Sequence, residues 1–205
     1  MHADATVIAG LLLASGQSRR FGSNKLLTPL AGRPVIRWSA EALASAVDIV
    51  LVVVPDRSLE MDDALAGVGA QWVVNARAHT GMASSLGAGI AALPPSTEAV
   101  VIALGDQPLT DASVVRSLTA RWRAGGVRAV APQYSDGRGH PVLFDASCFE
   151  SLLALHGDRG ARTVLDSLGD AVAIVPVATP QPVDVDTPDA LRAVSDALVR
   201  SQHGR

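Results

Sequence analysis

Cysteine is nearly absent from this sequence, because Cys148 is the only one among 205 residues. A single cysteine excludes an internal disulfide and any zinc site built from several cysteines. Cys148 precedes Phe149 in an apolar segment. We therefore expect a buried structural thiol rather than a nucleophile.

A strong excess of charge and long apolar runs are also missing. The formal net charge of −3 argues against nonspecific binding of nucleic acid. No apolar run approaches the roughly 20 residues that span a bilayer. The run 7–13 has the length of a signal-peptide core, but residues 1–6 contain no lysine or arginine and include Asp4. We therefore expect a cytoplasmic protein with neither nucleic acid nor a membrane as a partner.

Common catalytic motifs are missing as well. The sequence contains no G-x-S-x-G, H-E-x-x-H or C-x-x-C, and its five histidines lack the spacing of a metal site. These absences argue against a serine hydrolase, a zinc protease and a thiol redox enzyme.

Short apolar runs alternate with amphipathic stretches along a chain that is 48% hydrophobic and 18% charged. This alternation predicts one α/β domain over residues 1–205, with three layers and a mostly parallel central sheet. The expected strands are 7–13, 49–54, 72–75, 100–104, 129–131 and 172–177. The expected helices are 34–46, 59–66, 82–93, 112–124, 146–155, 161–168 and 188–199. Residues 132–144 are expected to form a hairpin or excursion beside the main sheet.

The loop over residues 14–25 is the most informative segment. It follows a buried strand and contains two glycines, serines, two adjacent arginines and Lys25. Backbone N–H groups, small side chains and cations together suit the phosphates of a nucleoside triphosphate. The loop fits neither G-x-G-x-x-G nor G-K-[ST], which argues against a dehydrogenase and a P-loop enzyme. The alternative is an ordinary turn with solvated basic residues.

Carboxylates follow two later apolar segments. Asp106 comes directly after the expected strand 100–104, where a hard oxygen ligand could hold Mg²⁺ together with substrate phosphates. Asp184 and Asp186 alternate, so in an extended segment they point to the same side. We expect Asp186 to complete the metal site, because it is closer to the turn. The alternatives are an Asx turn at Asp106 and a helix cap at Asp186.

Two further kinds of segment could contact substrates. Residues 80–86 begin a helix with free N–H groups and small hydroxyls, and Asn75 lies just beyond a strand, so both could reach a base edge or phosphate. Capping and turn roles remain equally open for them. Arg138 and His140 in the segment 137–141, and the arginines of 157–162, could contact a second, anionic substrate. A structural histidine and solvated arginines are the alternatives.

Together these segments resemble the MobA-like nucleotidyltransferases, and most closely their molybdenum cofactor cytidylyltransferase branch. The first loop matches the pattern L-A-x-G-x-S-x-R-x-G-x-x-K, with Ser15 at a position where alanine or glycine is more usual. The matching residues are Leu13, Ala14, Gly16, Ser18, Arg20, Gly22 and Lys25. Five later segments also match: 81–86, 105–108, 138–144, 157–162 and 184–188. The resemblance spans roughly residues 7–195; the first loop alone would identify only the superfamily.

The resemblance implies a Rossmann-like nucleotidyltransferase fold and transfer of CMP from CTP to the terminal phosphate of molybdopterin, with release of pyrophosphate. It implies a catalytic role for Arg20, Lys25 and Asp106, with Mg²⁺ on Asp106 and Asp186. The implied nucleotide-binding residues are Leu13, Ala14, Ser15, Gly16, Ser18, Arg19, Gly22, Asn75, Gly81, Met82, Ser84 and Ser85. The implied acceptor-binding residues are Arg138, His140, Arg159 and Arg162. The product would pass to a molybdoenzyme or its chaperone.

Two alternatives stay open at the level of sequence. A related transferase could use GTP or ATP and another small acceptor, such as a sugar phosphate or a phospholactate-type acid. A non-catalytic carrier of molybdopterin would need no metal carboxylates. Release of pyrophosphate with each nucleoside triphosphate would discriminate among these hypotheses.

Overall fold

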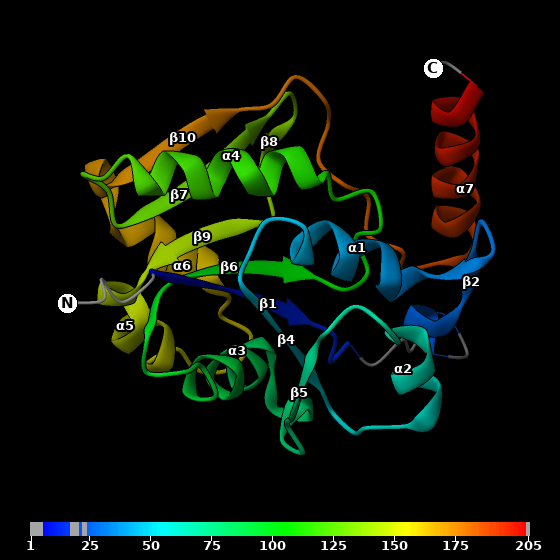
Figure 1. Ribbon diagram of the computed structural model, residues 1–205, viewed down its shortest axis with the longest axis horizontal. Coiled ribbons are helices and arrows are strands. Elements are labelled where there is room, and N and C mark those ends of the chain that lie inside the picture. Colours follow the sequence, from blue (N-terminus) through cyan, green and yellow to red (C-terminus); the bar gives the residue numbers. More distant parts are fainter. Residues whose placement is uncertain (1–5, 17–20, 22–23, 204–205) are drawn as a thin grey trace.

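The computed structural model describes residues 6–16, 21 and 24–203, with the side chains of 201–203 left out. One central sheet has the strand order β10-β7-β9-β6-β1-β4-β5, with the short β8 paired to β7 (Figure 1). The strands of this sheet are β1 (Val7–Leu13), β4 (Ile49–Val54), β5 (Gln71–Val74), β6 (Thr97–Leu104), β7 (Ala129–Tyr134), β8 (Gly137–Arg138), β9 (Val142–Asp145) and β10 (Val172–Pro176). A separate two-stranded hairpin is made by β2 (Pro29–Leu30) and β3 (Arg33–Pro34).

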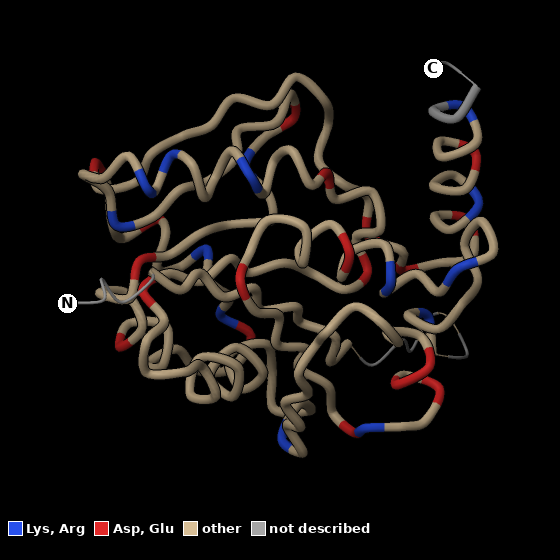
Figure 2. The backbone as a smooth tube through the Cα atoms, in the orientation of Figure 1, with Lys and Arg blue, Asp and Glu red and all other residues tan. Residues whose placement is uncertain are grey.

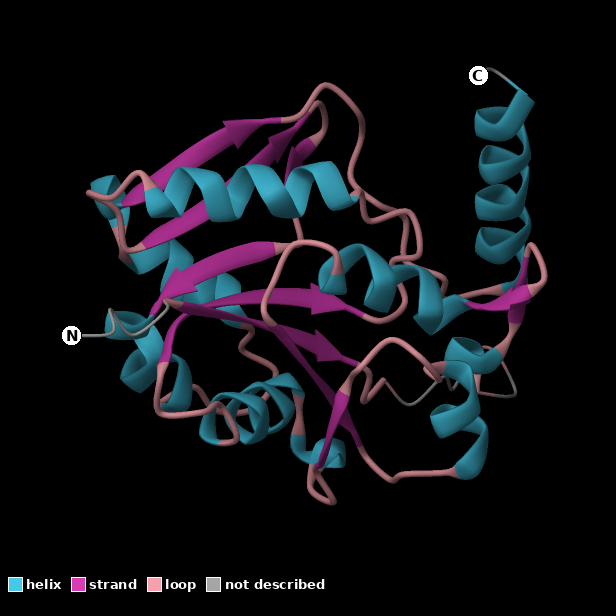
Figure 3. Ribbon diagram, viewed as in Figure 1, coloured by secondary structure: helices cyan, strands magenta, loops and turns pink. Residues whose placement is uncertain are grey.

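Helices cover both faces of the sheet (Figure 3). The α-helices are α1 (Val35–Ala44), α2 (Leu59–Ala64), α3 (Met82–Ala91), α4 (Ala112–Arg123), α5 (Phe149–Leu153), α6 (Ala161–Ser167) and α7 (Pro188–His203). Short 3-10 helices are η1 (Lys25–Leu27), η2 (Ala78–Thr80), η3 (Ala146–Cys148) and η4 (Gly169–Ala171). The predicted α/β class with a mostly parallel sheet is confirmed, because β1 pairs in parallel with both β4 and β6, and β4 with β5.

Alternate residues of the central strand β1 point into two different cores. Ile8 and Leu12 pack with α1, α2 and α4 on one face, whereas Ala9 and Leu11 pack with α3, α5 and α6 on the other. All four side chains are fully buried. A strand that is apolar on both faces therefore fixes the three-layer arrangement.

A third, smaller core lies beside the sheet and holds α7. Its buried members are Leu30, Val35, Val185 and Val194, which bring together the β2–β3 hairpin, the start of α1 and the helix α7. In Figure 1, α7 stands at one end of the molecule next to this hairpin. This packing fixes the segment just before α7, which carries Asp184 and Asp186.

The structure corrects the expected position of residues 142–144. These residues lie inside the sheet as β9, antiparallel to β6 on one side and to β7 on the other. Val142, Leu143 and Phe144 are all buried, so the run is apolar for the same reason as the parallel strands. The expected helix 146–155 is also split into η3 and α5, and Asp145 caps η3 through the N–H of Ser147.

Candidate active site

The candidate site lies at the carboxyl ends of β1 and β6. Strand order reverses around β1, since β4 and β5 extend to one side and β6 lies on the other. Ligands of open α/β sheets bind outside the carboxyl ends of the strands at such a position. The N–H of Gly105 donates to the carbonyl of Leu13 over 2.9 Å, so the loops after the two strands are joined at this point.

A buried lysine joins two carboxylates at this edge. The Nζ of Lys25 lies 2.5 Å from Oδ2 of Asp106 and 2.5 Å from Oδ1 of Asp186. The exposed fractions of the side chains are 6% for Lys25, 22% for Asp106 and 51% for Asp186. Lys25 begins η1, whose first turn is capped by the side chain of Asn24. Three segments far apart in sequence therefore meet at one ammonium group.

The charges at this site shift two pKa values. Burial acts to lower the pKa of Lys25, but hydrogen bonds and charges from Asp106 and Asp186 outweigh it and raise that pKa. Lys25 is therefore a fixed cation at physiological pH. Burial raises the pKa of Asp184, as do the nearby charges of Asp106 and Asp186, while the amide of Gln107 opposes this rise. The Nε2 of Gln107 donates to Oδ1 of Asp184 over 2.8 Å.

A pocket of about 520 Å³ opens on one side of this cluster. Its walls come from the loop after β1, the start of α3 and the loop after β6. The lining residues are Leu13, Ser15, Gly16, Ala78, His79, Gly81, Met82, Ser85, Leu104, Asp106, Asp158 and Asp184. Six residues predicted to bind nucleotide are among them, so the structure brings much of the predicted set to one cavity. We call this cavity the nucleotide-side pocket.

Gly81 allows the start of α3 to approach the loop before α6. Its φ of +120° lies in the region that favours glycine, and a Cβ there would collide with the carbonyl of Gly157. That same carbonyl accepts a hydrogen bond from the N–H of Ala83 over 3.0 Å. Two segments that the sequence singled out separately, 80–86 and 157–162, are therefore in direct contact.

Several residues predicted to bind nucleotide have other positions. Ala14 is buried beneath the loop. The Nδ2 of Asn75 donates to the hydroxyls of Ser84 and Ser85, and its Oδ1 accepts from the N–H of Arg77. Asn75 therefore fastens the start of α3. Ser84 lines a different groove, between that helix and the segment 153–157.

Four predicted residues, Ser18, Arg19, Arg20 and Gly22, lie outside the described residues. Their contacts with nucleotide stay predictions.

A second pocket, of about 280 Å³, lies on the other side of the cluster. Its lining residues are Leu104, Gln107, Arg138, Gly139, His140, Val142, Arg162, Leu165, Asp166, Gln181 and Asp184. Three of the four predicted acceptor-binding residues are among them, whereas Arg159 is exposed and does not line this cavity. We call it the acceptor-side pocket. It shares Leu104 and Asp184 with the nucleotide-side pocket, so two ligands would meet beside the carboxylates.

The polar groups of the acceptor-side pocket are held in place by neighbours. Asp166 lies 3.8 Å from Nη1 of Arg138 and 3.9 Å from Nε of Arg162. Tyr134 donates its hydroxyl to the carbonyl of His140 over 2.7 Å. Burial lowers the pKa of His140 to about 4, although the charge of Asp106 acts in the opposite direction. At neutral pH the basic groups of this pocket are therefore two guanidinium groups, both near the carboxylate of Asp166, while the imidazole is uncharged.

Sequence reasoning missed three of the polar residues in this pocket. Gln107 belongs to the segment 105–108 that was singled out for its aspartate, so its position was a usable signal. Gln181 lies in the segment 178–188, directly after an expected strand, where ligands of such sheets bind, whereas Asp166 carried no such signal. Gln181 reaches the pocket only because its loop packs against Gly139, where a Cβ would collide with the glutamine amide.

The donor set fits a divalent cation that is shared with a substrate. Mg²⁺ is bound through one or two carboxylates plus substrate phosphates, and Asp106 and Asp186 converge on a single point. The ammonium of Lys25 occupies that point and so stands in for a cation. Among the described residues, no group of three or more histidine, cysteine, aspartate or glutamate side chains is arranged to hold a metal. Substrate oxygens would therefore have to complete the coordination.

Charged residues of both signs are spread over the part of the chain that the structure describes (Figure 2). Figure 2 shows acidic and basic residues interspersed over the molecule, including along α7. In the part of the chain that the structure describes, no helix is both long and apolar enough to cross a membrane.

Comparisons with known proteins agree on the kind of domain. A sequence model of the MobA-like NTP transferase domain matches residues 10–172. The purine catabolism protein PucB of Bacillus subtilis (strain 168) is 29% identical over 208 residues, covering 93% of this chain and 97% of that protein. The molybdenum cofactor guanylyltransferase of Rhodobacter capsulatus is 31% identical over 202 residues, covering 93% and 96%.

Solved structures with similar folds cover nearly the whole chain as well. The crystal structure of Rv0371c from Mycobacterium tuberculosis H37Rv has a TM-score of 0.83 and 30% identity, covering 94% of this chain and 99% of that one. Another crystal structure of Rv0371c, with a TM-score of 0.78 and 28% identity, is a complex with manganese.

Proposed function

The chain belongs to the MobA-like NTP transferase family and is therefore a nucleotidyltransferase, and we propose a specific reaction for it. In this reaction it transfers CMP from CTP to the terminal phosphate of molybdopterin. Pyrophosphate is the second product, and a molybdoenzyme or its chaperone is the expected recipient of the dinucleotide. The observation that carries transfer between two bound substrates is the pair of pockets that share Leu104 and Asp184 beside Lys25, Asp106 and Asp186. The choice of CTP and molybdopterin comes from the family resemblance of the sequence.

The reaction needs positioning and charge stabilisation more than a covalent nucleophile. A phosphate oxygen of the acceptor attacks the α-phosphorus of CTP and forms a new P–O bond. The bond between the α-phosphorus and the bridging oxygen breaks, and pyrophosphate leaves with that electron pair. The nucleotide-side pocket holds the triphosphate, and the guanidinium groups of Arg138 and Arg162 attract the anionic acceptor.

Lys25 and the carboxylates supply the charges at the junction. Lys25 stabilises negative charge on the triphosphate, and by the family resemblance Arg20 does the same. Asp106 and Asp186 would hold the divalent cation, which when bound reduces the repulsion between the two phosphates. We propose Mg²⁺ for this role; the manganese complex of Rv0371c supports a divalent cation in a related fold.

One comparison favours a second candidate function. The relative from Rhodobacter capsulatus is a guanylyltransferase by name, and it supports the molybdenum cofactor as the acceptor but guanine as the base. Transfer of GMP from GTP is therefore the alternative. The mechanism is the same for both, because the reaction occurs at the α-phosphorus.

Pyrophosphate release tests the choice directly. Purified protein is incubated with molybdopterin, Mg²⁺ and each of CTP, GTP, ATP and UTP in turn. We expect turnover with CTP that exceeds the other three. Turnover with GTP and with no other nucleotide would mean that the protein transfers GMP instead of CMP to the same acceptor. Binding of molybdopterin without turnover of any nucleotide would establish the carrier hypothesis instead.

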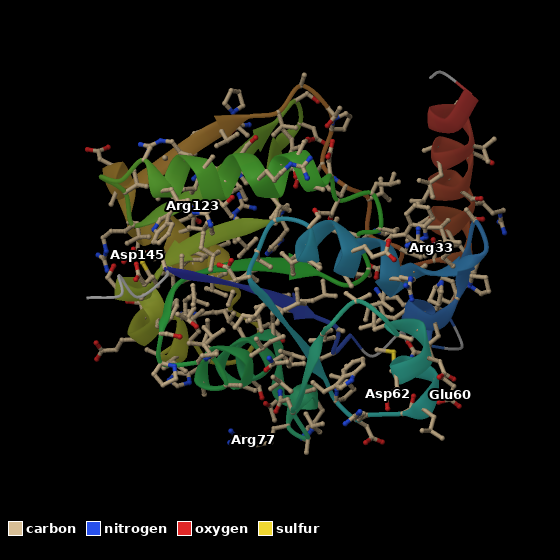
Figure 4. The ribbon with its side chains drawn as sticks, in the orientation of Figure 1. Arg33, Glu60, Asp62, Arg77, Arg123 and Asp145 are labelled. Carbon is tan, nitrogen blue, oxygen red and sulfur yellow. The ribbon has the colours of Figure 1, made fainter. Side chains whose placement is uncertain are left out.

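Asp106→Ala tests the role of the carboxylate pair. We expect pyrophosphate release to fall by about 10²-fold or more, because the cation loses one of its two protein ligands. Asp62→Ala is the matched control: this aspartate of α2 (Figure 4) pairs with Arg57 and lines neither pocket. Wild-type rates in the Asp106 variant, with its fold intact by circular dichroism, would remove Asp106 from the mechanism.

A further inference from the structure

We propose that Lys25 is a built-in substitute for the divalent cation, so that the metal enters the site together with the nucleotide and not before it. This inference rests on the proposed function, and it adds an order of binding. Lys25 holds the two carboxylates together while the nucleotide is absent. When the nucleotide binds, the ammonium group of Lys25 leaves the carboxylates and pairs with the triphosphate.

The geometry places the ammonium where a metal would bind. Its Nζ is 2.5 Å from one oxygen of Asp106 and 2.5 Å from one oxygen of Asp186. Oxygen ligands of Mg²⁺ lie about 2.0–2.1 Å from the ion, so each of these two oxygens is only slightly farther from the ammonium nitrogen than it would be from a metal. The ammonium and the metal therefore compete for the same oxygens.

The competition favours Lys25 while the metal is alone. The lysine is part of the chain and its side chain is 6% exposed, so free metal has to displace a buried cation that cannot diffuse away. Free metal would gain only two carboxylate ligands in exchange, because the described residues provide no group of three or more ligands. We therefore expect weak binding of free Mg²⁺ or Mn²⁺.

A bound nucleotide offers new partners both to the metal and to Lys25. Its phosphate oxygens can complete the coordination of the metal, which otherwise keeps several waters. The same polyanion offers the displaced ammonium a new partner. The nucleotide-side pocket is lined by Asp106 itself, and a Cβ placed at Gly16 would lie 3.9 Å from Cε of Lys25. The side chain of Lys25 therefore already lies close to the lining of this pocket at Gly16.

Binding of Mn²⁺ in the absence of nucleotide provides the first test. Lys25→Met keeps an apolar chain of similar length and removes the competing cation. We expect it to bind Mn²⁺ at least about tenfold more tightly than the wild type, measured by calorimetry or by the electron paramagnetic resonance of free Mn²⁺. Arg123→Met removes the same charge at the far end of α4 (Figure 4) and should stay within about twofold of the wild type.

The sequence provides a second, independent measurement on the wild-type protein. Lys25 is the only lysine among the 205 residues, so labelling with ¹³C,¹⁵N-lysine gives the resonances of one side chain. We expect these resonances to stay in place when Mg²⁺ is added alone. They should shift when Mg²⁺ is added with CTP or GTP. This measurement does not depend on the folding of a variant.

Both readouts separate this inference from the proposed function. Equal Mn²⁺ affinity in the wild type and Lys25→Met would overturn it, and so would a shift of the lysine resonances by Mg²⁺ alone that matches the shift with nucleotide. The Mn²⁺ titration and the addition of Mg²⁺ alone can both be measured on a protein that does not turn over any substrate. A protein that releases no pyrophosphate with any nucleotide would therefore refute the proposed function and still reveal whether Lys25 competes with the metal.

Discussion

His140 shows how a tertiary environment changes the chemistry of one residue. The segment 137–141 indicated two side chains that could carry positive charge, Arg138 and His140. Burial in the wall of the acceptor-side pocket instead lowers the pKa of the imidazole to about 4. At neutral pH His140 is therefore an uncharged side chain in the wall of this pocket, and the positive charge there comes from Arg138 and Arg162.

This shift predicts a pH dependence of stability. Below the ordinary pKa of 6.5 the unfolded chain takes up a proton on His140, whereas the folded chain takes it up only near pH 4. The free energy of unfolding therefore falls as the pH drops through this range, by about 1–3 kcal/mol from this group. In His140→Gln, the free energy of unfolding from urea melts should fall less between pH 7 and pH 4.5 than it does in the wild type.

The exposed His156 provides the control for this measurement. His156→Gln should keep the slope of the wild type. An unchanged dependence on pH in His140→Gln would contradict the assignment of a neutral, half-buried imidazole.

Lys25 shows the limit of motif reading at the same scale. The loop pattern singled out this residue for its positive charge and assigned it to the triphosphate alone. Its partners Asp106 and Asp186 are 81 and 161 positions away in the sequence. A local pattern carries no information about contacts over such separations.

At the scale of elements, the turn between η2 and α3 depends on a single glycine. Gly81→Ala should lower the free energy of unfolding by about 2 kcal/mol or more, because the backbone is left-handed there and the new methyl group meets the carbonyl of Gly157. Affinity for nucleotide should fall with it, since Gly81 lines the nucleotide-side pocket. Chemical denaturation and a nucleotide titration measure the two effects.

The same helix offers a matched control. A Cβ at Gly87, within α3, would meet no atom within 4 Å. Gly87→Ala should therefore stabilise the protein by about 0.5–1 kcal/mol through helix propensity. If Gly81→Ala and Gly87→Ala changed the free energy of unfolding equally, the close contact between Gly81 and Gly157 would not explain the effect of Gly81→Ala.

Helix α7 has a stabilising role that extends to the site. Val194 is 1% exposed and packs with Val185, which lies between the two aspartates of this segment. Val194→Ala should cost about 2 kcal/mol of stability. It should also raise the concentration of divalent cation needed for half-maximal pyrophosphate release, because Asp186 is held less firmly.

Val199 lies on the same helix and is 49% exposed. Val199→Ala should change stability by less than about 0.5 kcal/mol and leave the metal requirement unchanged. A metal requirement that stays at the wild-type value in Val194→Ala would show that α7 does not position Asp186.

At the scale of the whole molecule, the two pockets predict that the substrates can be perturbed separately. Arg138→Gln should raise the KM for the acceptor by about tenfold, because a charged contact with its phosphate is lost. The KM for the nucleotide should stay within about twofold, since Arg138 does not line the nucleotide-side pocket. Steady-state kinetics with each substrate varied in turn measures both constants.

Arg116, exposed on α4, provides the control for charge. Arg116→Gln should leave both constants unchanged. An equal rise of both constants in Arg138→Gln would mean that the two cavities do not bind separate substrates.

The fold class and the family of the domain could both be predicted from the amino-acid sequence. Apolar runs such as 7–13 and 49–54 match β1 and β4 residue for residue, because a strand buried on both faces leaves a continuous local signal. The motifs that resemble the MobA-like family are likewise short and contiguous, and the comparisons confirm the family. Local patterns are sufficient where the physical cause is local.

Only the tertiary structure decided how these segments meet. It inserted β9 between β6 and β7, although the apolar run 142–144 alone could not reveal its neighbours. It placed Asp184 in the wall shared by both pockets and Lys25 between Asp106 and Asp186. These contacts arise when sheet order and the packing of α7 bring distant loops to one edge. That packing is a property of the whole chain.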